Sequence, residues 1–208
     1  MSARAGALLL VAGLPAACGL FADAPTPKPV NAYRGDERDL AHVKRIMVLP
    51  FSPAPGVSAQ ATQVREAFLG EMAKIQKFEV VPLPDGAEED RELYASLRHG
   101  RISAGELVEL GKRYRLDGVL LGTITNYRPY LPQNLGLRMQ LTSLHSGATV
   151  WAAEGHYDAS DSATQNDLEH FATTFLGEEQ SMHGWRINLL SPQKFAAFVS
   201  HRLVATLR

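Results

Sequence analysis

The spacing of apolar residues predicts a strand, a helix and a second strand at the start of the folded part of the chain. Residues 45–51 (RIMVLPF) are an apolar run closed by prolines, which is typical of a strand buried on both faces. Between Val57 and Ile75 apolar residues recur every three or four positions, which predicts a helix with one buried face. Residues 78–83 (FEVVPL) predict the next strand. Such a unit predicts parallel strands joined by a right-handed crossover.

A helix and a three-stranded meander are predicted next. Ser103 and Glu106 have the spacing of a capping box, in which each side chain accepts a backbone N–H at a helix start. The polar and apolar alternation then predicts three consecutive strands, at residues 118–127, 135–144 and 148–158. The middle strand shows the alternation most clearly, with one face buried and the other exposed to solvent. Trp151 is expected on the buried face of the third strand.

Two helices are predicted at the C-terminal end. Leu168, Phe171 and Phe175 mark the first, while Ser191 and Pro192 are typical of the cap and first turn of the second. Apolar residues of the second helix then recur in a way that predicts docking: Phe195, Phe198, Val199, Leu203 and Leu207. The element order is β-α-β-α-β-β-β-α-α. It predicts the α/β (α+β) class, with a mixed sheet of about five strands and flanking helices.

The N-terminal residues have the pattern of a secretory signal. Arg4 precedes an uncharged run at residues 5–17, which ends at Cys18, the single cysteine. A basic residue, a short apolar stretch and small residues before a cut are the parts of a signal peptide. The run is too short for the roughly 20 apolar residues of a membrane-spanning helix. The mature chain is therefore expected to begin near Cys18.

Residues 14–18 (LPAAC) resemble the bacterial lipobox, with Pro15 where an aliphatic residue is usual. The resemblance implies that Cys18 carries a diacylglycerol and an N-acyl chain, with no other cofactor. Several acyl chains on one residue hold a protein durably on a membrane. Gly19 is not the aspartate that retains some lipoproteins in the inner membrane, so an outer-membrane anchor is expected by analogy. The alternative is an ordinary cleaved signal or short anchor, with Cys18 as a small buried residue.

The segment after Cys18 is expected to be a tether. Residues 18–44 are polar, include three prolines and end in a charged stretch, so we expect an extended, flexible linker. The predicted organisation is a signal peptide at 1–17, this tether, and one domain at 45–208. The chain has 208 residues and a formal charge of −1, which gives no bias toward nucleic acid.

Four segments of the domain together resemble a family of envelope proteins. They are RIMVLPF at 45–51, FEVV at 78–81, LDGVLLGTI at 116–124 and SGATVW at 146–151. This series is similar to that of CsgG, LpoB, PelC and the TolB N-terminal domain. The resemblance implies their α/β fold and a place in the cell envelope. It implies no single function, because its members serve secretion, cell-wall synthesis, polysaccharide export and the Tol system.

The sequence contains no familiar catalytic motif. The best candidates for a metal are His156, Asp158 and His170, with Asp161, Asp167 and Glu169 nearby. We favour a structural role for the acids, as helix caps or first-turn residues that offset the helix dipole.

Two loops have the composition of contact surfaces. The first, residues 127–134, carries Tyr127, Arg128 and Tyr130 in a proline-stiffened connection. The second, residues 182–186, carries Trp185 and Arg186 between two helices. Aromatic residues and arginine dominate many protein interfaces, and stiffness lowers the entropy cost of binding. Packing of either loop onto its own domain is the alternative.

These patterns predict a non-catalytic, lipid-anchored protein on the periplasmic face of the envelope. Its expected partners are the membrane, through the anchor, and an envelope protein or further copies of itself, as in an export accessory or oligomeric scaffold. One alternative is a tethered activator of a membrane-bound cell-wall synthase, which the length of the tether favours. A second alternative is an enzyme or small-ligand binder that uses the histidine–acid cluster.

Overall fold

The computed structural model describes residues 27–83, 96, 102–177 and 184–208, and its core is a mixed seven-stranded sheet. The expected signal peptide, Cys18 and residues 182–183 lie outside these ranges. The strand order is β1-β7-β6-β5-β2-β4, and β3 pairs with β5 outside this path. The strands are β1 (Asn31–Arg34), β2 (Arg45–Val48), β3 (Ser52–Pro53), β4 (Glu79–Val81), β5 (Gly118–Arg128), β6 (Asn134–Ser143) and β7 (Thr149–Asp158).

The predicted strands and their directions are confirmed. β5, β6 and β7 form the antiparallel meander, and β2 lies between β4 and β5, parallel to both. Ile46 and Val48 of β2 belong to one buried cluster, whereas Met47 belongs to a second. β2 is therefore buried on both faces, as its continuous apolar run predicts.

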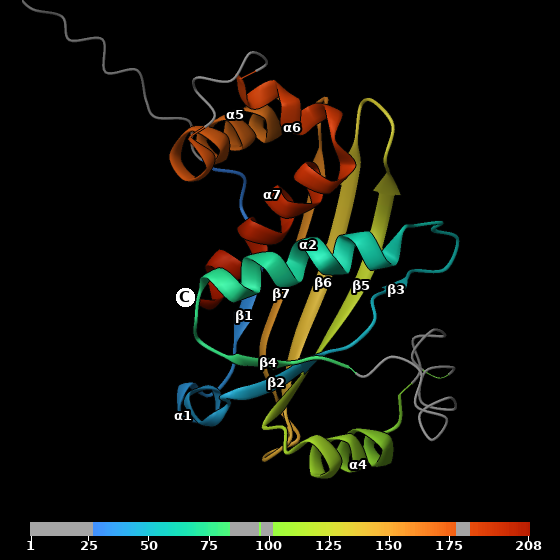
Figure 1. Cartoon of the computed structure of the whole chain (residues 1–208), viewed down its shortest axis with the longest axis vertical. Coiled ribbons are helices and arrows are strands. Elements are labelled where there is room, and N and C mark those ends of the chain that lie inside the picture. Colours follow the sequence, from blue (N-terminus) through green and yellow to red (C-terminus); the bar gives the residue numbers. More distant parts are fainter. Residues whose placement is uncertain (1–26, 84–95, 97–101, 178–183) are drawn as a thin grey trace, which may run out of the picture.

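The helices lie on one face of the meander and at its two ends (Figure 1). α2 (Ala61–Lys74) and α7 (Pro192–Val204) lie across one face of the meander. Trp151 is fully buried, as predicted. α4 (Ala104–Tyr114) packs on the second cluster through Leu110, and its predicted capping box is present. Ser191 caps α7 as predicted. No helix in the described ranges is long and apolar enough to span a bilayer.

The two ends of the meander differ in what surrounds them, and we name them for later use. The apical end holds α5 (Ser162–Phe171), its continuation η2 (Ala172–Leu176), η4 (Gly184–Arg186), α6 (Ile187–Leu190) and the β5–β6 loop. The basal end holds α1 (Glu37–His42), α4 and the β6–β7 turn (Figure 1).

The expectation of a flexible tether as far as residue 44 is wrong. β1 pairs with β7, and the Asp36 carboxylate caps α1, which begins at Glu37. The sequence pattern does not indicate these elements, because all four β1 side chains are exposed and α1 buries only Leu40. The domain therefore includes residues that were assigned to the tether. β1 and the two-residue β3 also account for the difference between seven strands and the five expected.

Candidate contact surface

The β5–β6 loop combines a firmly bonded base with an exposed apolar tip. At the base, the Arg128 Nε donates to the Pro132 carbonyl at 2.6 Å, and the Ala159 N–H donates to the Gln133 carbonyl at 2.8 Å. At the tip, Tyr130 is 79% exposed and Leu131 is 62% exposed. The loop is thus held by its backbone while its two large apolar side chains face solvent.

Asp158 adds a charged contact at the base of the same loop. It lies 3.2 Å from the Arg128 guanidinium and accepts a 2.8 Å hydrogen bond from the Asn134 amide. Hydrogen bonds from the Ser160 hydroxyl and N–H, then from Asn134, together with the Arg128 charge, lower the pKa of Asp158 to about 2. Asp158 is therefore ionised at neutral pH and stays paired with Arg128.

The segment that contains η4 and α6 resembles the β5–β6 loop in combining packed, hydrogen-bonded residues with an exposed apolar side chain. Trp185 packs partly buried against the main core, and the Arg186 guanidinium lies 5.0 Å from the centre of its ring. The buried Asn188 amide donates to the Trp185 carbonyl at 2.8 Å. Leu190, at the end of α6, is 58% exposed.

These two segments, far apart in the sequence, meet at the apical end. The Gln133 amide Nε2 donates to the Leu189 carbonyl at 2.8 Å, and the Gln133 side chain is almost completely buried. This bond joins the β5–β6 loop to α6 (Figure 1). We call Tyr130, Leu131 and Leu190, with the supporting Arg128 and Arg186, the apical surface.

The structure gives different places to the residues predicted for contact. Tyr130, Arg128 and Arg186 are exposed at the apical end, but Tyr127 and Trp185 pack against the core and support the surface from beneath. Burial raises the pKa of the Tyr127 hydroxyl, in agreement with this supporting place.

Two members of the surface, Leu131 and Leu190, were not predicted from the sequence. An apolar residue between prolines, as in Tyr130-Leu131-Pro132, is a signal that could have found the first, because such a loop has no core to bury it. Leu190 continues the apolar pattern of its helix, so nothing in the sequence distinguishes it from a buried residue.

The histidine and acidic candidates for a metal have separate structural roles. His156 Nε2 lies 2.9 Å from the Asn134 side-chain oxygen, and His170 Nδ1 lies 3.4 Å from the Thr174 hydroxyl. Asp161 caps α5, as favoured from the sequence. Within the described ranges, no three histidine, cysteine or acidic side chains are grouped so as to hold a metal ion.

Asp167 is part of a charged cluster that fastens the N-terminal segment to the domain. The Lys28 backbone N–H donates to Asp167 at 2.9 Å, and its Nζ lies 3.0 Å from Asp161. Arg202 of α7 lies 3.2 Å from Asp167 and donates to the Lys28 carbonyl at 3.0 Å. Burial raises the pKa of Asp167, although Arg202 and the Lys28 N–H oppose this effect. We call these four residues the Lys28 clamp.

A second buried pair joins α2 to α7 beneath the apical end. Glu71 and His201 are 4% and 7% exposed, and their facing atoms are 3.1 Å apart. Lys74 contacts the other oxygen of Glu71 at 2.6 Å. Burial acts to raise the pKa of Glu71, but hydrogen bonds from His201 and Lys74 outweigh it and hold the pKa below its ordinary value. The ionised carboxylate accepts from both partners.

Comparison with known proteins finds likeness in structure only. No model of a protein family matches the chain, and no curated protein matches it significantly. A PelC dodecamer from Paraburkholderia phytofirmans is 12% identical, with a TM-score of 0.47 over 85% of this chain and 98% of that one. The LpoB C-terminal domain from Escherichia coli is 17% identical, with a TM-score of 0.41 over 54% of this chain and 81% of that one.

A third solved structure, the lipoprotein GNA1162 from Neisseria meningitidis, is 15% identical, with a TM-score of 0.39 over 55% of this chain and 79% of that one. PelC and LpoB are also among the proteins that segments of the sequence resemble.

Proposed function

We propose that this chain is a non-catalytic lipoprotein of the periplasmic face of the outer membrane, which acts by binding protein within an envelope assembly. The observation that carries the proposal is the apical surface. Tyr130, Leu131 and Leu190 are each more than half exposed, although bonds from Arg128 and Gln133 hold the segments beneath them. Single exposed apolar residues are common, but several large ones on two segments that are bonded to each other are characteristic of interaction sites.

The anchor in this proposal is Cys18. A signal-like run ends at this residue, and acylation would account for a lone thiol in an oxidising compartment. Growth with a radiolabelled fatty acid tests it directly. We expect label in the parent chain and none in Cys18→Ala, whereas an unlabelled parent chain would contradict the anchor.

The Lys28 clamp favours an assembly close to the membrane over an activator with a long reach. The activator was favoured by a tether that extended to residue 44, but Lys28 already belongs to the domain and lies ten residues after Cys18. Ten extended residues span at most about 35 Å. We therefore prefer an export accessory or oligomeric scaffold, and keep the synthase activator as the alternative.

Site-specific photocrosslinking in the native host tests the contact role. A photoreactive phenylalanine replaces Tyr130 in one variant and Val108 in a matched control, since Val108 is 47% exposed on α4 at the basal end. We expect an adduct of defined mass from position 130 and none from position 108. Adducts in multiples of the mass of the processed chain would indicate self-association, and another mass would indicate a different partner. No adduct from position 130 would contradict the proposal.

A further inference from the structure

The end of the α5–η2 helix carries a second exposed apolar pair. Phe175 is 50% exposed and Leu176 is 39% exposed, and both belong to η2. The following residue, Gly177, has a φ of 63°, which ends the helix directly after the pair. Phe175 and Leu176 therefore lie at a helix end on the outside of the domain.

Phe175 is fixed in place although half of it faces solvent. Its ring centre lies 4.5 Å from that of His201 and 5.9 Å from that of Phe171. His201 is itself held by Glu71 across α2 and α7. The Phe175 ring is thus already positioned, so burying its exposed half costs little ordering entropy.

The Lys28 clamp fastens the N-terminal segment to the same helix. Asp161 and Asp167, which bind Lys28, belong to the cap and body of α5, and Phe175 follows in its continuation. Figure 1 shows the first described residues beside α5. The chain that leads to Cys18 therefore leaves the domain next to α5.

We propose that the α5–η2 end lies on the lipid bilayer, with Phe175 and Leu176 in the interfacial layer. The inference rests on the proposed anchor at Cys18, because an acylated residue ten positions before Lys28 keeps this end within reach of the membrane. Two apolar side chains alone bind a bilayer weakly. Once the acyl chains hold the protein there, the contact is intramolecular and needs no strong affinity of its own.

This orientation places the apical surface near the membrane as well, because α6 and the β5–β6 loop belong to the same end of the molecule (Figure 1). The protein bound by Tyr130, Leu131 and Leu190 would then have to be embedded in the membrane or lie close to it. The basal end, with α1 and α4, would face away from the bilayer.

Quenching by brominated lipid tests the orientation in the full-length acylated chain. Phe175→Trp and, as a control, Val108→Trp are reconstituted in phosphatidylethanolamine and phosphatidylglycerol vesicles, with or without bromine near the headgroups. The parent emission is subtracted, since Trp151 and Trp185 are present in every chain. We expect bromine to remove about half of the emission added at position 175 and almost none at position 108, as a depth of several ångströms in the interface implies.

The outcomes separate this inference from the proposed function. If the chain floats with the vesicles but position 175 is not quenched, or both positions are quenched equally, the orientation is overturned and the anchor stands. A tryptophan at 175 that is shielded from an aqueous quencher but not quenched by bromine would show that a second copy covers the site, which also overturns it. A chain that does not float would overturn the anchor, and this inference with it.

Discussion

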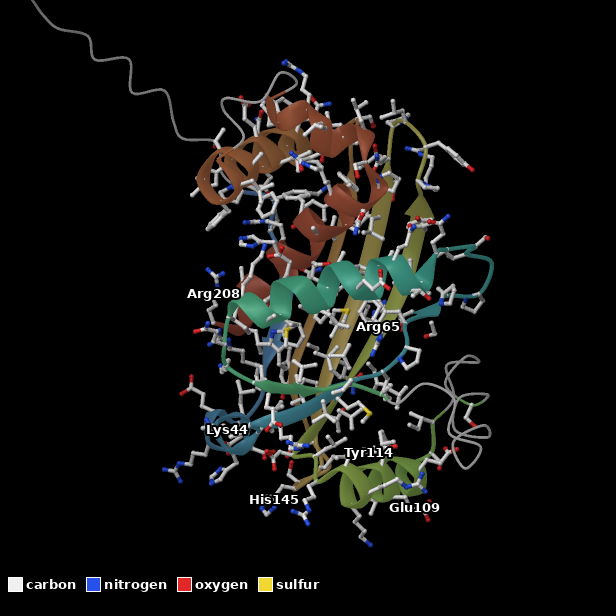
Figure 2. The ribbon with its side chains drawn as sticks, viewed as in Figure 1. Lys44, Arg65, Glu109, Tyr114, His145 and Arg208 are labelled. Carbon is white, nitrogen blue, oxygen red and sulfur yellow. The ribbon has the colours of Figure 1, made fainter. Side chains whose placement is uncertain are left out.

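The basal and apical ends both contain bonded polar groups, but among the described residues the group of large exposed apolar side chains lies at the apical end. At the basal end, Asp39 of α1 accepts hydrogen bonds from the Ser143 and Ser146 hydroxyls in the β6–β7 turn. Asp117 accepts the Lys44 and Arg45 N–H groups at 3.0 and 2.8 Å. Lys44 and His145 mark this end in Figure 2.

A cavity of about 210 Å³ also lies at the basal end, lined by His42, Val43, Asp117, Ser143 and His145. Its carboxylate already holds two backbone groups, and Val43 lies in the core. At the apical end, bonds of the same kind stop at the base of the loops, beneath Tyr130, Leu131 and Leu190. Polar bonds therefore hold both ends in place. What distinguishes the apical end as a contact surface is that large apolar side chains are exposed above the bonded segments.

The largest effect on stability is expected at the support of the apical end. Glu71→Ala leaves buried His201 without its hydrogen-bond partner, and an unsatisfied buried group costs about 1 to 3 kcal/mol, or more where a charged group takes part. Lys74→Ala, which removes the exposed partner of the same carboxylate, should cost less than about 1 kcal/mol. Chemical denaturation of both variants measures the difference. Equal losses of unfolding free energy in the two variants would show that the buried contact of Glu71 with His201 stabilises the fold no more than the exposed contact with Lys74.

The same pair predicts an acid limit to stability. Because the folded pKa of Glu71 is depressed, its contribution is fully present above the ordinary value of 4.5 and is lost as the pH falls through the lower folded value. Unfolding free energies between neutral pH and pH 3 should therefore fall more for the parent chain than for Glu71→Gln. Parallel curves would contradict this assignment.

The next largest effect is expected where the two apical segments join. Gln133→Ala removes the bond to the Leu189 carbonyl from a buried site, at a cost of about 1 to 3 kcal/mol. Gln140 of β6 is exposed and bonded to Thr149, so Gln140→Ala is a matched control with a cost below about 0.5 kcal/mol. Thermal unfolding compares them. Losses of the same size would mean that the junction adds no support to the apical surface.

A smaller effect is expected at the basal end. Asp39→Ala removes the bonds to Ser143 and Ser146 from a partly exposed site, which should cost about 1 kcal/mol. Hydrogen bonds from Ser146 and then Ser143 lower the pKa of Asp39, so this contribution is lost as the pH falls below the ordinary value of 3.8. Glu37→Ala on the same helix is the control. Unchanged photocrosslinking at position 130 in Asp39→Ala would confirm that the ends act independently.

The smallest effect on stability, with the largest on binding, is expected at the apical tips. Tyr130→Ser with Leu131→Ser should change the unfolding free energy by less than about 0.5 kcal/mol, because both side chains face solvent. The double variant should nevertheless lose its partner, whereas Val108→Ser should keep it. Partner binding that survives in the double variant would place the contact elsewhere.

Much of the fold could be predicted from the sequence, because its central elements bury regular apolar patterns. The run around Ile46, the alternation in β6 and the cap at Ser191 each specify a local structure that the tertiary packing retains. β1 and α1 could not be predicted, since β1 buries no side chain and depends on backbone pairing with β7. Long-range pairing of that kind leaves no local signature.

The contact surface could be predicted only in part, for a similar reason. The composition of the β5–β6 loop indicated Tyr130, but its junction with α6 depends on the bond from Gln133 to Leu189, 56 positions apart. The Lys28 clamp joins residues separated by up to 174 positions. Contacts between residues so far apart depend on how the elements are arranged in the fold. The sequence pattern predicts the fold class but not these individual contacts.

The mass of the protein extracted from its own membrane tests the central claim most directly. The full-length chain and the Tyr130→Ser, Leu131→Ser variant are solubilised in mild detergent, and light scattering with detergent correction gives the protein mass of each. We predict a parent complex of a mass well above that of one processed chain, and a variant reduced to a single processed chain. A parent that is itself a single chain, or a variant of unchanged mass, would contradict a role based on contact through the apical surface.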